Sequence, residues 1–461
     1  MLSLIDSRGT RRAFLSAGSL ALGGLSLPML GARGARAASG SSSLATGKSV
    51  IFLFMHGGPA QTETFDPKMT APAEIRSATG EIGTALPGIT FGSSFEKLAA
   101  RADRLLVVRS FVPGDARHDI KPIVCRQSLG ANIGSIYARI VGPNIATSGL
   151  PSQCLLLPRA VDPSAMPAIT QFGRFDSAGE FGAAYAPFTP SAGGTMQENM
   201  KLQLPLARLD DRRSLLAQLD QMRRRFDTRA AGWDDLRRQA FDTILGGAAK
   251  AFDLRREDPR TVAAYDTAPL VRPEQISSRW TNYKRYIDNA KTLGKLLLMA
   301  RRLCEHGVGF VTVTTNFVWD MHADMNNATM TEGMRYMAPP FDHAVSAFLD
   351  DVEQRGLSDD ILLVCCGEMG RTPKLNARGG RDHWGRLGPL LMAGGGLPAG
   401  QVIGQSSSDA GQPATTPVSI ENLIGTIVHT MFDVGKLRLA AGLPTTITNR
   451  LAGYQPIPGL H

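Results

Sequence analysis

The sequence predicts an α/β protein built around a doubly wound, mostly parallel sheet with an inserted helical block. Short apolar runs of strand length alternate with amphipathic stretches of helix length, which is typical of a parallel sheet covered by helices. Several of the runs end in acidic and histidine residues, as expected where strands open into a site. The composition, with 43% hydrophobic and 20% charged residues among 461, is that of a globular protein.

Residues 1–37 are predicted to be a twin-arginine signal peptide. Arg11 and Arg12 stand within Thr-Arg-Arg-Ala-Phe-Leu, a moderately apolar stretch follows, and residues 35–37 (Ala-Arg-Ala) match a cleavage site. A membrane anchor is the alternative, but the stretch is rich in Gly, Ser and Ala, whereas a span needs about 20 strongly apolar residues. We expect the twin-arginine export machinery to carry the folded protein to the periplasm or beyond, with no stable membrane span after cleavage.

The charge of the chain argues against a nucleic-acid partner. The formal net charge is +9, and the signal peptide accounts for +4 of it (five Arg minus one Asp), which leaves 9 − 4 = +5. A mildly basic protein without a nucleic-acid motif or a basic stripe interleaved with aromatic residues gives no reason to expect nucleic acid. The five cysteines include no Cys-x-x-Cys pair, so buried free thiols are expected rather than a zinc knuckle or a redox dithiol.

After a Ser/Gly/Ala linker at 38–47, residues 48–461 are expected to form one domain with an insertion at about 158–280. The insertion comprises a Gly/Pro-rich part at 158–200 and an amphipathic helical block at 205–256. Strands are expected where apolar or β-branched runs are short, at 49–55, 105–110, 154–157, 308–315, 361–366 and 389–393. Helices are expected at 95–102, 280–306 and 335–356, and from Pro417 onward.

Polar clusters follow four of these strands. They comprise Glu63 and Asp66; Asp115, His118 and Asp119; Asp320, His322 and Asp324; and Glu368 and Arg371, with Asp382 and His383 soon after. Neighbouring strands of a sheet lie about 5 Å apart, so clusters distant in sequence can meet at one edge. Carboxylate and imidazole ligands together suit a divalent ion, namely Zn, Mn, Mg or Ca. The alternatives are a structural ion pair of Glu368 with Arg371 and a local hydrogen bond between Asp320 and His322.

The motifs that carry these residues resemble a known family. They are His-Gly-Gly-Pro…Thr-Phe-Asp-Pro-Lys (56–68), Val-Arg-Ser…His (108–118), Trp-Asp-x-His (319–322), Gly-Glu-x-Gly-Arg-Thr-Pro (367–373) and Gly-Arg-Asp-His-Trp (380–384). In this order they resemble the bacterial domain-of-unknown-function family 1501 (DUF1501), a branch of the alkaline-phosphatase and sulfatase-like superfamily. The twin-arginine signal is similar to that of many members. The resemblance implies an alkaline-phosphatase-like fold, whereas a shared fold does not transfer a reaction.

The resemblance also implies a ligand set for one or two divalent metal ions. The matching positions are Glu63 or Asp66, Asp320 with His322, Glu368, and His383. Two positions depart from the superfamily pattern. Glu63 stands where Asp is expected, and residues 114–119 (Gly-Asp-Ala-Arg-His-Asp) contain no hydroxyl or thiol nucleophile. Either His118 takes a covalent role or a water molecule acidified by the metal attacks directly.

The leading hypothesis is therefore an exported, metal-dependent hydrolase of phosphate or sulfate esters. Its substrate would be a small anionic ester or an ester-bearing polymer. His118, Arg371 and Asp382 are the candidate catalytic residues, with Arg371 neutralising a substrate oxygen and His118 acting as nucleophile or general acid/base. The alternative is a secreted, non-catalytic binding or assembly factor that keeps the sulfatase-like fold. A cytoplasmic nucleotide-binding enzyme fits poorly with the export signal and the lack of a phosphate loop.

Overall fold

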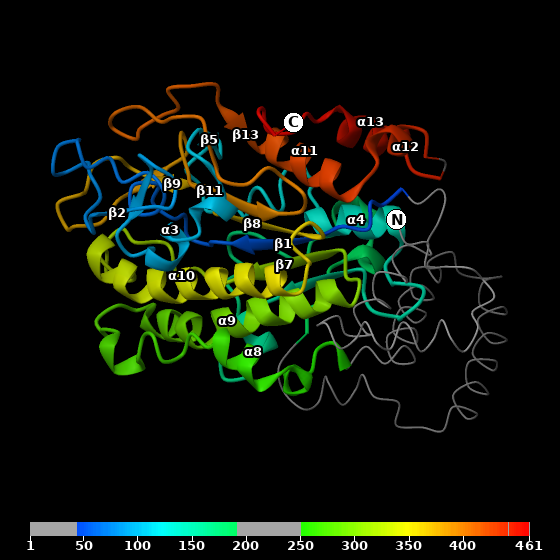
Figure 1. The fold of residues 1–461 in the computed structure, drawn as a ribbon, viewed down its shortest axis with the longest axis horizontal. Coiled ribbons are helices and arrows are strands. Elements are labelled where there is room, and N and C mark those ends of the chain that lie inside the picture. Colours follow the sequence, from blue (N-terminus) through cyan, green and yellow to red (C-terminus); the bar gives the residue numbers. More distant parts are fainter. Residues whose placement is uncertain (1–43, 191–249, 441, 461) are drawn as a thin grey trace, which may run out of the picture.

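The computed structural model of the chain describes residues 44–190, 250–440 and 442–460. The predicted signal peptide, most of the predicted linker and most of the predicted helical block at 205–256 lie outside the described residues. Figure 1 shows a central sheet between two layers of helices. The predicted fold class, an α/β protein with a doubly wound and mostly parallel sheet, is confirmed.

The central sheet has seven strands in the order β12-β4-β11-β8-β1-β7-β6. Each of the six predicted strands is present in it. The bounds are Ser49–Phe54 (β1), Leu106–Val108 (β4), Gln153–Leu156 (β6), Phe310–Thr314 (β7), Ile361–Cys366 (β8), Leu390–Gly394 (β11) and Gln401–Ile403 (β12). Strand β1 is parallel to both β7 and β8, whereas β11 runs antiparallel to its neighbours β4 and β8. The carboxyl ends of β8, β1 and β7 consequently lie side by side.

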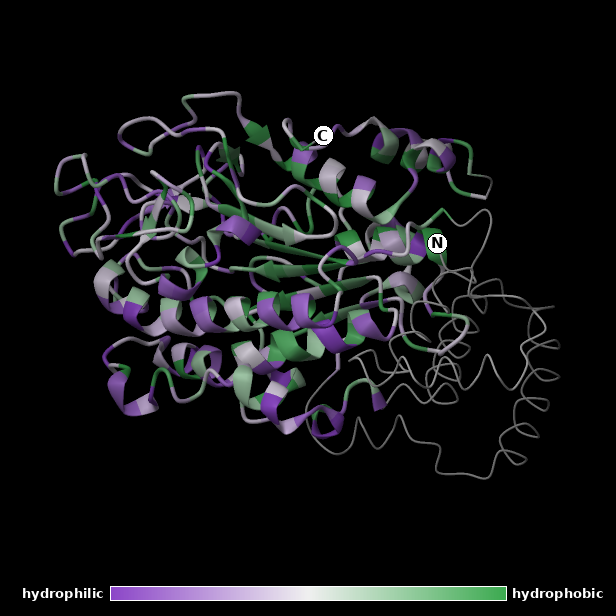
Figure 2. Cartoon of the chain, viewed as in Figure 1, coloured by the Kyte–Doolittle hydropathy of each residue, from purple (hydrophilic) through white to green (hydrophobic). Residues whose placement is uncertain are grey.

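The two faces of β1 bury alternate side chains, because successive residues of a strand point to opposite faces. Ile51 and Leu53 pack in one apolar cluster with α9 (Tyr283–Glu305) and α10 (Met330–Gln354). Val50, Phe52 and Phe54 pack in a second cluster with α4 (Ile133–Val141) and α11 (Ile420–Met431). Hydrophobic strands lie between helices with polar outer faces (Figure 2). Both faces of the central sheet are therefore covered.

The helices differ from the predicted ranges mainly at their ends. The helix expected at 335–356 begins earlier, at Met330, where the Thr329 side chain caps it, and it contains Pro339 and Pro340. The helix expected from Pro417 begins at Ile420, because Val418 and Ser419 pair with another short strand before Ser419 caps the helix. The helix expected at 95–102 is confined to α3 (Glu96–Ala99). Within the described ranges, the remaining α-helices are α8 (Pro259–Ala264), α12 (Val434–Arg438) and α13 (Thr445–Gly453).

Short elements connect the layers outside the central sheet. The two-stranded pairs are β2 (Glu81–Gly83) with β3 (Thr90–Gly92), β5 (Phe111–Val112) with β13 (Val418–Ser419), and β9 (Gly370–Arg371) with β10 (His383–Trp384). Single 3-10 turns comprise Ala102–Arg104, Pro158–Ala160, Gly179–Phe181, Ala183–Tyr185, Leu254–Arg256 and Pro273–Gln275. Of these pairs, β9 with β10 matters most for the site, because it places His383 opposite Arg371.

All five cysteines are free thiols, and four of them are buried. This confirms the expectation of buried free thiols for Cys154, Cys304, Cys365 and Cys366, while Cys125 is partly exposed. Among the described residues, no helix is both long and apolar enough to cross a membrane.

Candidate functional site

The site begins at the turn that follows β1. Gly57 has φ +113°, and a Cβ atom there would lie 2.5 Å from the backbone nitrogen of Asp320. Only glycine therefore lets this turn approach the loop after β7 so closely. The Gly57 N–H donates to both carboxylate oxygens of Glu368, at 2.9 and 3.1 Å. The segments after β1, β7 and β8 are thus joined at one point.

Asp320 is the centre of the site. Its side chain is nearly buried, and its Oδ1 accepts a hydrogen bond from Arg371 Nη2 at 2.5 Å. Its Oδ2 lies 3.0 Å from His322 Nε2 and 2.9 Å from Asn327 Nδ2. Burial alone raises the pKa of Asp320, but Arg371 and the neighbouring imidazoles outweigh it and hold the pKa well below its ordinary value. Asp320 is therefore an anion at neutral pH.

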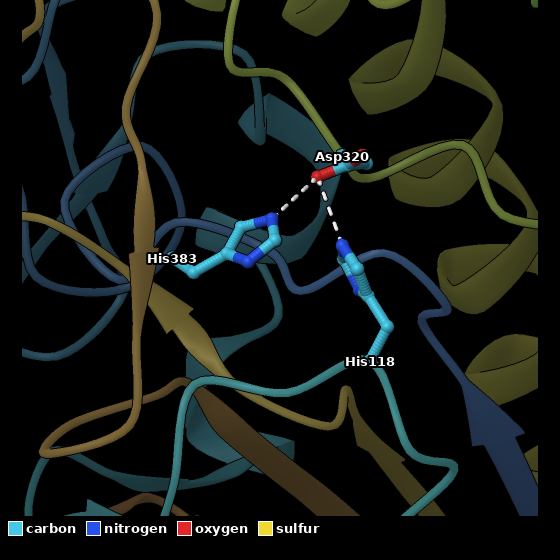
Figure 3. Close-up of side chains that lie close together, drawn as sticks. All are labelled: His118, Asp320 and His383. Atoms are coloured by element: carbon cyan, nitrogen blue, oxygen red, sulfur yellow. Dashed lines mark ion pairs between the residues drawn. The ribbon is translucent and has the colours of Figure 1, made fainter. Parts of the chain in front are cut away.

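His118, Asp320 and His383 form a group whose ligand atoms all lie within 4.8 Å of one another. The Nε2 atoms of His118 and His383 each lie 3.4 Å from Asp320 Oδ1, and both imidazoles point toward that oxygen (Figure 3). Two ligand atoms bound at about 2.1 Å in a tetrahedral arrangement lie about 3.4 Å apart. His383 Nε2 is also buried without a hydrogen-bond partner among the described residues. Both observations fit a divalent metal ion at this point.

Glu368 fixes the orientation of His118. Its Oε1 lies 2.8 Å from His118 Nδ1, so Nδ1 carries the proton in this bond and Nε2 faces Asp320. A carboxylate behind a histidine is the usual arrangement around protein-bound metals. Burial by itself lowers the pKa of His118, but Asp320 and Glu368 outweigh it and raise the pKa above its ordinary value. A cation that binds at Nε2 would therefore compete with protonation of the imidazole.

Aromatic side chains form a wall on one side of His118. The ring centroids of Phe172 and Phe317 lie 4.9 Å apart in a stacked arrangement. The centroid of the His118 ring lies 4.9 Å from that of Phe172 and 4.8 Å from that of Phe317. Asn316 and Phe317 have φ values of 66° and 65°, which are unfavourable for residues with side chains. This backbone strain occurs between β7 and Asp320. The Phe317 ring that follows this strained turn packs against the His118 ring.

His56 is a site residue that the sequence did not single out. Its ring lies 4.8 Å from that of Phe317 and 5.4 Å from that of Phe175, and its Nε2 is buried with no hydrogen-bond partner among the described residues. Burial lowers the pKa of His56 to about 4, so the imidazole is neutral at pH 7. The signal available in the sequence was its position at the end of β1, within the His-Gly-Gly-Pro motif.

The structure gives Glu63 and Asp66 partners outside this group. Glu63 is fully buried and pairs with Arg381 at 3.0 Å, while its other oxygen accepts from Ser77 at 2.8 Å. Asp66 pairs with Lys68 at 3.3 Å and with Arg109 at 3.6 Å, and it accepts a hydrogen bond from Ser406. The predicted metal ligands Glu63 and Asp66 are thus engaged in structural contacts, and neither belongs to the group around Asp320.

The remaining predicted site residues differ in whether they contact Asp320 directly. His322 contacts the second oxygen of Asp320, whereas Glu368 lies behind His118. The Arg371 guanidinium is fully buried and donates to the Gly57, Gly58 and Arg381 carbonyls as well as to Asp320. Asp382 is exposed, and its carboxylate accepts from Asn376 Nδ2 at 3.0 Å.

A comparison with protein families identifies the chain. The family described as "Protein of unknown function (DUF1501)" matches residues 47–449. The chain belongs to the DUF1501 family. Every residue of the site described above lies inside the matched range. The family resemblance seen in the sequence is therefore confirmed, and the family's description states no activity.

Two solved structures are similar to this DUF1501 protein. One is the phosphonate monoester hydrolase SpPMH from Silicibacter pomeroyi, with 11% identity and a TM-score of 0.33. The other is the phosphonate monoester hydrolase of Agrobacterium radiobacter, with 10% identity and a TM-score of 0.29. Each match covers 83% of this chain and 73% of the other chain. A search of curated proteins found no match.

Proposed function

We propose that this protein is an exported, metal-dependent hydrolase that acts on phosphate or sulfate esters. The observation that carries the proposal is the position of Asp320 Oδ1, 3.4 Å from Nε2 of both His118 and His383. Two imidazoles and one carboxylate are a ligand set that leaves room for substrate at a catalytic metal ion. A bound divalent cation would polarise an ester oxygen and acidify a water molecule.

The contacts of the surrounding residues support roles that differ from those expected from the sequence. His118 faces a carboxylate with each nitrogen, so it acts in this proposal as a metal ligand rather than as a nucleophile. The Arg371 guanidinium donates its hydrogen bonds to Asp320 and to backbone carbonyls. In this proposal it therefore fixes the position of Asp320, a metal ligand, and does not contact a substrate oxygen. His322 is partly exposed beside Asp320, and in this proposal its imidazole serves as the proton donor to a leaving group.

Elemental analysis and ester hydrolysis test the proposal together. The purified exported protein is analysed for divalent metals and assayed against phosphate monoesters, phosphate diesters and sulfate esters. We expect bound metal and turnover of at least one ester class, and a loss of both in Asp320→Asn and His383→Gln. The control is His306→Gln, because His306 bonds to a backbone carbonyl at the end of α9 and has no contact with the site. Activity that survives both site substitutions rejects the assignment.

Export is proposed from the twin-arginine signature alone. Replacing Arg11 and Arg12 by Lys keeps the charge of the N-terminus but removes the pair that the twin-arginine pathway requires. We expect this variant to accumulate as precursor in the cytoplasm, which cell fractionation and immunoblotting would detect. Normal export of the variant would reject the proposal for localisation without affecting the proposal for the metal site.

A second candidate function is a secreted binding or assembly factor that holds a structural metal without turnover. One observation favours it. In the described parts of the chain, the side chains paired with Asp320 and His118 are imidazoles, a guanidinium, an amide and a carboxylate, and a hydroxyl nucleophile is not among them. Bound metal without hydrolysis of any ester class would favour this alternative.

A further inference from the structure

A cavity lies away from the Asp320 group, between α3, α8 and α10. Its volume is about 450 Å³, which lies within the range of pockets that hold small organic ligands. One face of α10 lines it through His343, Ser346 and Asp350. Lys97 lines it from α3 and Arg260 from α8. None of the residues assigned above to the metal site lines this cavity.

The cavity carries positive charge that nearby acids do not neutralise. Of the carboxylates that line it, Asp350 already pairs with Arg101 at 2.6 Å. Asp351 forms ion pairs with Arg301 at 2.7 Å and with Arg355 at 2.6 Å, and neither arginine lines the cavity. Among the described residues, neither the Lys97 ammonium nor the Arg260 guanidinium has a carboxylate within ion-pair distance. These two cations are therefore available to an anion.

Two neutral polar groups on α10 complete the cavity. Ser346 is 2% exposed, and its Oγ has no hydrogen-bond partner among the described residues. A buried hydroxyl without a partner destabilises the fold, so a ligand or a water molecule is expected to satisfy it. His343 Nδ1 lies 2.5 Å from Lys97 Nζ. Burial and the charge of Lys97 lower the pKa of His343, so the neutral ring accepts this hydrogen bond and holds the ammonium beside the cavity.

We propose that this cavity binds a small organic anion whose phosphate or carboxylate oxygens contact Lys97, Arg260 and Ser346. The volume exceeds that of an inorganic ion, so the ligand has an organic part that lies over the small side chains of Ala264 and Ala347. This site is independent of the proposed hydrolytic function. It adds a binding function to a region of the fold whose other contacts are structural.

Isothermal titration calorimetry tests the proposal on metal-free protein. The parent for all titrations is the unsubstituted protein, in which Asp320 still neutralises Arg371 and faces the imidazoles of His118 and His383. The probes are glucose 6-phosphate, citrate and inorganic phosphate, with glucose as the neutral control. We expect at least one of the two organic anions to bind with a Kd below about 1 mM, more tightly than inorganic phosphate does. Binding should weaken as ionic strength rises, because the attraction is electrostatic.

Substitutions in the cavity locate the binding. Lys97→Gln with Arg260→Gln should weaken binding at least about tenfold, since both charged donors are lost. Ser346→Ala should weaken binding without lowering the melting temperature, because it removes an unpartnered buried hydroxyl. A purely structural serine would not show this combination. The matched control is Arg256→Gln, an exposed arginine outside the cavity, which should bind as tightly as the parent.

Two results would overturn the proposal. One is the absence of measurable heat with both organic anions up to about 10 mM, a concentration at which even weak binding is detected. The other is unchanged affinity in the variant that lacks both Lys97 and Arg260. Failure here leaves the proposal for the metal site untouched, because none of the residues of that site lines the cavity.

Discussion

Oε1 of Glu368 lies 2.8 Å from Nδ1 of His118. These residues are 250 positions apart in the sequence, and the contact aims Nε2 of the imidazole at Asp320. The same carboxylate accepts the Gly57 N–H, so it ties the turn after β1 to the loop that carries His118. Glu368 therefore determines the geometry of the candidate metal site without belonging to the group of ligand atoms itself.

Glu368→Gln should weaken metal binding. The amide keeps the size of the side chain but loses the charge that orients His118 and raises its basicity. Loss of such a partner costs about 10- to 100-fold in metal affinity. Titration of Zn²⁺ or Mn²⁺ into metal-free protein measures this, with circular dichroism to verify the fold. Unchanged affinity would mean that His118 does not bind the metal or does not need Glu368.

Asp320→Ala should destabilise the protein far more than Asp320→Asn. Both substitutions remove the carboxylate that pairs with the fully buried Arg371 guanidinium, and breaking a buried ion pair costs about 3–5 kcal/mol. Alanine in addition leaves a buried Arg371 N–H without its acceptor. Asparagine keeps an oxygen that can accept the hydrogen bond from Arg371. Urea denaturation of the two variants gives their free energies of unfolding. Equal losses would show that the charge of Asp320, rather than its hydrogen bond, is what stabilises Arg371.

Acid should destabilise the protein through His56. Its pKa is about 4 in the folded state and close to 6.5 when unfolded, so the unfolded chain binds more protons between these values. The stability contributed by neutral His56 is therefore full above pH 6.5 and is lost as pH falls toward 4, a change of roughly 3 kcal/mol.

The variant His56→Phe isolates this effect. Phenylalanine fits the aromatic surroundings and does not titrate, so its free energy of unfolding should fall less between pH 7 and pH 4 than that of the wild type. Titratable groups that do not interact with His56 contribute equally to both proteins and cancel in the difference. Parallel pH dependences would show that His56 does not carry the acid sensitivity.

Gly57→Ala should disrupt both the fold and the site. Its Cβ would lie 2.5 Å from the Asp320 nitrogen and 2.9 Å from Trp319 backbone atoms, in addition to the strain of φ +113°. Gly88→Ala is the matched control, because Gly88 has φ +75° but nothing within 4 Å of its Cβ position. The control should lose about 1–2 kcal/mol. Gly57→Ala should lose clearly more stability and bind metal more weakly, and similar losses in the two variants would contradict the close approach.

The sequence predicted the strands of the sheet and the edge at which polar residues gather. Apolar runs of strand length are visible locally, and β1, β7 and β8 lie within a few residues of their predicted ends. The direction of β11 was not predictable from its residues, because an apolar run has the same pattern whether its neighbours are parallel or antiparallel. The helix that begins at residue 330 starts there because the Thr329 side chain caps it. The helix that begins at residue 420 starts there because the two preceding residues pair with another strand and Ser419 caps it.

The sequence by itself determined which acids and histidines follow the strands, and only the tertiary structure decided which of them face one another. Glu63 and Asp66 have the right chemistry for a metal, but long-range partners such as Arg381 and Arg109 engage their oxygens. His118 belongs to the group of ligand atoms because its contact with Glu368 directs the ring toward Asp320. The physical reason is that a free lone pair depends on every hydrogen-bonding group within about 3 Å, and these groups come from distant parts of the chain.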